Sequence, residues 1–233
     1  MIPIVYYFTA SFYTARLAAY FNRVLIASQL SDTQDMDLLK LRQLWIEELR
    51  TVSPYFGQML QQSQGIYQHF FSKLPSLQTP QDANEYFDWS HNYLNNIGST
   101  LQLGQANESV YSYGFHLGNI YSNLEILNWA LALDSIGSNK NLSQKAQIEN
   151  ILEELRTTQF KWSAAAINLG NFPAFKTLWE IWRQLQKEVE AIEKLQYSPA
   201  EDKYAQMSKL IMPTIEAIEN QGKVIFEILQ KAI

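Results

Sequence analysis

Apolar residues recur every three or four positions along nearly the whole chain, and no segment shows the sustained alternation of a strand. This spacing places apolar side chains on one face of an α-helix. After Pro173, for example, Leu178, Trp182 and Leu185 would share such a face. Glycine and proline, which interrupt helices, number only 9 and 7 in 233 residues. The sequence therefore predicts an all-α fold.

Start and stop signals divide this pattern into several helices. The sequence predicts a loop at 74–80, a helix from about Gln105 to Ile136 and a polar turn at 137–142. A later helix should end at Gly170, because glycine is a common C-terminal stop. Ser198-Pro199-Ala200-Glu201 has the pattern of a capping box and predicts the start of the last helix.

These signals predict a single α-helical domain over residues 1–233. A chain of this length is ample for one core. The connections are short, so consecutive helices should be mostly antiparallel neighbours. We expect a multi-helix bundle of about six to eight helices.

The middle of the chain contains no basic residue. All 18 lysines and arginines lie outside Leu74 to Asn139. Exposed helices usually carry mixed charge, so this segment is expected to supply buried central helices. The alternative is an acidic face that meets a partner.

Composition excludes several classes of chemistry. The absence of cysteine rules out disulfides, thiolate zinc sites, iron–sulfur clusters and cysteine nucleophiles. A formal net charge of −5 disfavours nucleic acid, which requires clustered cations. The three histidines have no histidine partner at helical spacing, and only Asp88-x-x-His91 approaches a carboxylate–histidine metal motif. No phosphate-binding loop or nucleophile elbow is present in the sequence. We predict no catalytic residue, metal or cofactor.

The N-terminal residues 1–29 form a predicted amphipathic helix. Tyr13, Leu17 and Tyr20 would share one face, with Arg16 on another. Its initial apolar run is shorter than the roughly 20 residues that span a bilayer. This helix either packs in the core or lies at a membrane interface.

The segment from Gln105 to Ile136 holds the candidate binding residues. Gly114, Gly118 and Ser122 are spaced by four beside an apolar stripe. Small residues at this spacing let a neighbouring helix backbone approach closely, or leave room for a flat ligand. The second interpretation predicts a ligand site formed by Tyr113, Gly114, His116, Gly118 and Asn123.

The leading functional prediction is a non-enzymatic helical interaction or scaffold protein in the cytoplasm. Its partner would be a protein, either another copy or a different chain. One alternative is a helical bundle that binds an apolar or aromatic small molecule. Another is a peripheral protein attached to a membrane surface through residues 1–29, with a membrane-associated or cell-envelope location.

Overall fold

The computed structural model describes residues 105–132 and 142–232 and part of the N-terminal segment. We call the described N-terminal positions the N-terminal strip; all of them are helical, and they are Ile4, Val5, Tyr7, Phe8, Ser11, Phe12, Ala15, Arg16 and Ala19. Every regular element in this part of the chain is helical, which confirms the all-α prediction there. The predicted loop 74–80, the rest of 1–29 and most of the turn 137–142 lie outside the described residues.

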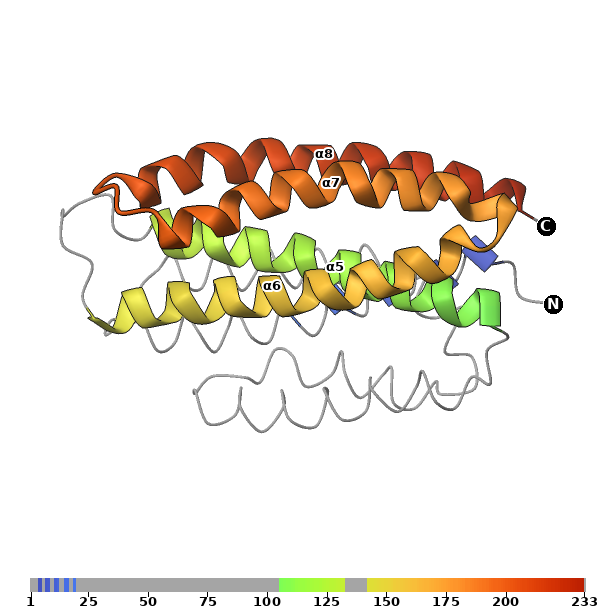
Figure 1. Cartoon of the computed structure of the whole chain (residues 1–233), viewed down its shortest axis with the longest axis horizontal. Coiled ribbons are helices and arrows are strands. Elements are labelled where there is room, and N and C mark those ends of the chain that lie inside the picture. Colours follow the sequence, from blue (N-terminus) through green and yellow to red (C-terminus); the bar gives the residue numbers. More distant parts are fainter. Residues whose placement is uncertain are drawn as a thin grey trace, which may run out of the picture.

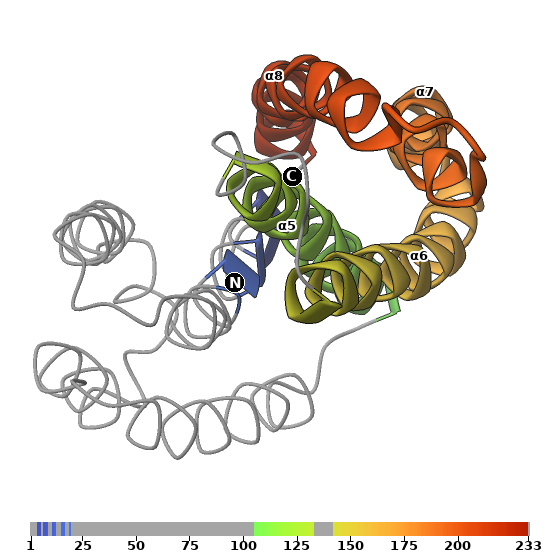
Figure 2. The ribbon, with the colours of Figure 1, turned by 90° about the vertical axis from the view of Figure 1, so that its left-hand side faces the viewer.

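Four long helices form a closed ring. They are α5 (Gln105–Ala132), α6 (Leu142–Gly170), α7 (Lys176–Lys194) and α8 (Lys203–Lys231). Each helix packs against the next, and α8 returns to pack against α5. Consecutive helices run in opposite directions (Figure 1), and the ring is visible end-on (Figure 2). Short 3₁₀ turns at Pro173–Phe175 and Leu195–Tyr197 join α6 to α7 and lead out of α7.

Helix α5 is the most deeply enclosed of these elements. Fifteen of its 28 residues are buried, and it contains no lysine or arginine. Its core face is apolar, and the hydroxyl of fully buried Tyr113 donates a hydrogen bond of 2.9 Å to the carbonyl of Leu178 in α7. This bond satisfies a buried polar group that would otherwise be costly. The part of the basic-free segment that the structure describes is therefore a helix with just over half of its residues buried.

The N-terminal strip lies directly on α5. A Cβ atom added to Gly114 would lie 2.7 Å from the carbonyl oxygen of Phe8. One added to Gly118 would overlap the carbonyl oxygen of Phe12 and lie 3.0 Å from the Cβ of Ala15. The spacing of small residues in α5 thus allows the close backbone approach of another helical segment.

The predicted capping box at Ser198–Glu201 is wrong, because α8 begins at Lys203. Ser198 instead ends the Leu195–Tyr197 turn with an extended backbone. Its Oγ accepts a hydrogen bond of 3.2 Å from the N–H of Ala200, two residues on, rather than three. A short local bond therefore uses the oxygen that a capping box would need. The end of α6 at Gly170 does match the prediction.

Two glycine-to-alanine substitutions should have opposite effects on stability. Gly222→Ala should raise the free energy of unfolding by about 0.5–1 kcal/mol, because its Cβ meets nothing within 4 Å and alanine favours helix. Gly118→Ala should lower it by about 1–3 kcal/mol, because the strip must shift. Urea midpoints with unchanged m-values would measure both effects. Equal gains from both variants would show that the strip does not contact α5 in solution.

Candidate ligand-binding groove

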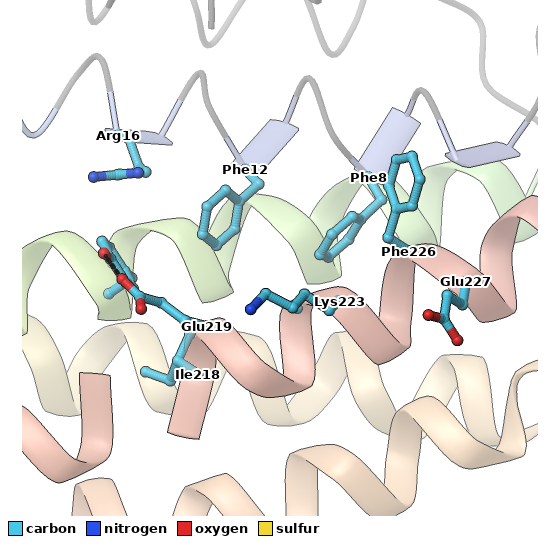
Figure 3. A pocket seen from close by; sticks show the side chains of 10 residues that line it. Phe8, Phe12, Arg16, Ile218, Glu219, Lys223, Phe226 and Glu227 are labelled. Carbon is cyan, nitrogen blue, oxygen red and sulfur yellow. Dashed lines mark hydrogen bonds between the residues drawn. The ribbon is translucent and has the colours of Figure 1, made fainter. Parts of the chain in front are cut away.

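A groove of about 620 Å³ runs between the N-terminal strip and α8. Phe8 and Phe12 form one wall, and Phe226 points toward them from α8 (Figure 3), where Ile218 also belongs to the lining. Tyr121 of α5 also lines the groove. The full lining is Phe8, Phe12, Arg16, Tyr121, Ile218, Glu219, Gly222, Lys223, Phe226 and Glu227.

The groove is elongated along the helix axes. The strip contributes residues from Phe8 to Arg16, and α8 contributes residues from Ile218 to Glu227. At about 1.5 Å of rise per residue, both walls extend for roughly 12–14 Å. The apolar lining residues Phe8, Phe12, Ile218 and Phe226 are distributed along this length.

One end of the groove is held by a polar cluster. The guanidinium of Arg16 lies 4.5 Å from the ring centre of Tyr121 and 3.6 Å from the carboxylate of Glu125. The hydroxyl of Tyr121 donates a hydrogen bond of 2.6 Å to Oε1 of Glu219. Burial, and then the charge of Glu125, raises the pKa of Tyr121, so the hydroxyl stays protonated. This cluster ties the strip, α5 and α8 together.

Three further residues of α8 shape the groove. Gly222 leaves open space where a side chain would stand. Lys223 points its ammonium group toward the Arg16 end, whereas at the other end the side chains of Phe226 and Glu227 point to opposite sides of α8 (Figure 3). The opening at Gly222 contrasts with the glycines of α5, whose missing side chains are replaced by the strip.

The five residues predicted as a ligand site lie elsewhere, and none of them lines this groove. Tyr113, Gly114 and Gly118 are brought together where α5 meets the strip, and the strip occupies the space beside both glycines. The ring of Tyr113 also packs on Trp162, with centroids 5.5 Å apart. Asn123 is buried. A ligand at these positions stays a prediction, and it would have to displace protein that fills the site.

His116 is partly buried beside Phe115, with their rings edge-to-face at 5.6 Å. Its Nδ1 is buried and makes no hydrogen bond in the structure. Burial, and then the positive charge of Lys161, lowers the pKa of His116 to about 4. The imidazole is therefore neutral in the folded protein at neutral pH.

Sequence reasoning missed the groove because its walls come from opposite ends of the chain. Phe8 and Phe12 are spaced by four, which indicated only a helix face. The one local feature of the sequence that could have indicated the groove was Gly222, in the middle of the last predicted helix. A glycine there weakens a helix unless open space or close approach is needed.

The described residues contain no group of three potential metal ligands close enough to hold an ion. Within the same residues, no helix is both long and apolar enough to cross a bilayer. No protein-family model, curated protein or solved structure matches the chain. The geometry of the groove is therefore the basis for any proposal about its ligand.

The lowered pKa of His116 makes a prediction about acid sensitivity. Its pKa is about 4 in the folded protein and ordinarily 6.5, so the unfolded chain binds more protons between these values. Stability supplied by neutral His116 is therefore lost as the pH falls from 6.5 to 4. We expect His116→Gln to lose less unfolding free energy than the wild type between about pH 7 and about pH 4.5. Denaturant titrations at the two pH values would show this, and identical losses would contradict it.

Proposed function

We propose that this protein is a non-enzymatic helical binding protein whose groove takes an elongated apolar ligand. The observation that carries the proposal is the volume of about 620 Å³ with aromatic side chains on both walls. Ligand sites commonly have roughly 300–1,000 Å³ and a mainly apolar lining with a few polar groups. A whole partner helix, about 10 Å across, would need more room.

The polar groups of the groove support binding rather than catalysis. Arg16 is held by Glu125 and the ring of Tyr121, and the Tyr121 hydroxyl is held by Glu219. A general acid or base needs a pKa near the working pH, whereas the pKa of Tyr121 is raised. These groups maintain the shape of the groove.

Filling the groove should block binding without unfolding the protein. The neutral dye N-phenyl-naphthylamine, whose emission rises in apolar surroundings, serves as the probe. Gly222→Leu should weaken its binding by about tenfold or more, because the leucine occupies the open space. Asn220→Leu is the matched control, since it adds the same side chain to an exposed position of α8 outside the groove.

The dye titration has two informative failures. No binding to the wild type would overturn the groove as a ligand site. Equal weakening by Gly222→Leu and Asn220→Leu would place the dye elsewhere on the protein. Urea midpoints no lower than that of the wild type for both variants would show that the fold is intact.

A second candidate is the interaction or scaffold protein, with a protein partner on the outer face of α6. Phe160 is 80% exposed and Ile167 is 53% exposed, and they lie seven residues apart on one face. Single exposed apolar residues are common, but a pair on one stripe favours a contact surface. The partner would be another copy or a different protein.

The α6 surface can be tested directly. If it binds a second copy, Phe160→Ser should shift the mass measured by light scattering from dimer toward monomer. Thr157→Ser, an exposed position on the same helix, should leave the mass unchanged. A monomeric wild type at high concentration would exclude self-association on this face.

The burial of the N-terminal strip does not favour attachment to a membrane through residues 1–29. Its apolar positions Val5, Phe8 and Ala15 are buried against the bundle. A cytoplasmic location, the absence of a nucleic-acid partner and a total of six to eight helices stay predictions.

A further inference from the structure

Helix α6 presents an exposed stripe in which small and large side chains alternate. We call it the α6 stripe, and its residues are Thr157, Phe160, Ala164 and Ile167. Their spacing of three, four and three places them on one face of the helix. All four are exposed, and the phenylalanine is 80% exposed. Two large apolar side chains on one exposed helix face favour contact with another protein surface.

The order of sizes along the α6 stripe is complementary to itself in one direction only. If a second copy packs antiparallel with its Ala164 opposite Phe160, then its Thr157 lies opposite Ile167. Each large side chain then meets a small one, and the two-fold symmetry makes each contact twice. In a parallel pair, Phe160 would meet Phe160 and a gap would remain between the two Ala164 residues. Close packing requires large side chains opposite small ones, so the antiparallel pair fits better.

The charges along α6 favour the same arrangement. Residues 145–156 include three exposed acids and two exposed bases. The only charged residues of 157–176 are two exposed lysines, Lys161 and Lys176. The first part is therefore net negative and the second net positive. An antiparallel copy brings parts of opposite charge together, whereas a parallel copy brings like charges together.

We propose that the α6 stripe is the interface of an antiparallel dimer of this chain. This inference rests on the second candidate function, because it names the partner of the same α6 surface and the register of the contact. The contact lies on the opposite side of the ring from α8, so it leaves the groove free (Figure 2). Interfaces that bury less than about 1,200 Å² are usually weak, and for a contact through one helix face we expect a Kd of roughly 10 µM to 1 mM.

An exchange of large and small residues tests the register. Ala164→Phe should weaken the dimer by about tenfold or more, although it adds apolar surface, because each new ring meets Phe160 of the other copy. The double variant Phe160→Ala/Ala164→Phe should restore most of the affinity, because a large residue again meets a small one. Sedimentation equilibrium would measure the three constants. Ala205→Phe is the control, since it adds the same ring at an exposed position of α8.

The absence of native cysteine allows the direction of the pair to be measured with single spin labels. The exposed residues Glu154 and Lys161 would each be changed to cysteine and labelled. In the antiparallel register, the two labels at 161 lie near the symmetry axis, whereas those at 154 are separated by about 24 Å along the helices. The distance between labels in the dimer should therefore be roughly 15 Å longer at 154 than at 161. Equal distances would indicate a parallel pair and overturn the proposal.

The other outcomes separate this inference from the proposed functions. Tighter association of Ala164→Phe would overturn the register and leave the α6 surface as a protein contact. A wild type that stays monomeric at about 1 mM would overturn the dimer. Neither result bears on the groove, which the dye titration tests by itself. Far-UV circular dichroism would show that each variant is folded.

Discussion

The contact of the N-terminal strip with α5 is the constraint on which the groove depends. Gly114 and Gly118 let the backbone at Phe8 and Phe12 lie against the helix with no side chain between them. The strip is therefore fixed by α5 rather than by α8. Its phenylalanine side chains project toward α8, and the space that they share with the residues of α8 is the groove (Figure 3).

The rest of the bundle is consistent with a core centred on α5. Two tyrosines of this helix use their hydroxyls to reach other helices, Tyr113 to α7 and Tyr121 to α8. Such bonds between distant segments specify how the helices pack in an otherwise apolar core. A misplaced helix would leave a buried hydroxyl without a hydrogen-bond partner. Helix α5 therefore determines the position of its neighbours through both packing and hydrogen bonds.

Local sequence patterns predicted local structure well. Apolar periodicity identified the helices, Gly170 marked the end of α6, and the small-residue spacing indicated a close helix approach at α5. The capping prediction at Ser198 failed because the hydroxyl accepts its hydrogen bond from the N–H of Ala200, two residues on, and the sequence pattern does not distinguish this local bond from one to the residue three positions on. The candidate site was beyond such patterns, since nothing near Phe8 indicates that it will face Phe226.

Because Phe8 and Phe226 lie far apart in the sequence, the groove can form only late in synthesis. One wall of the groove is made early on the ribosome and the other only when α8 has left the exit tunnel. A nascent chain that still lacks α8 therefore cannot contain the groove, whatever helices it has already formed. A ligand of the proposed site, which would bind only when both walls are in place, would also favour the native state by mass action. The groove therefore requires both the N-terminal strip and α8.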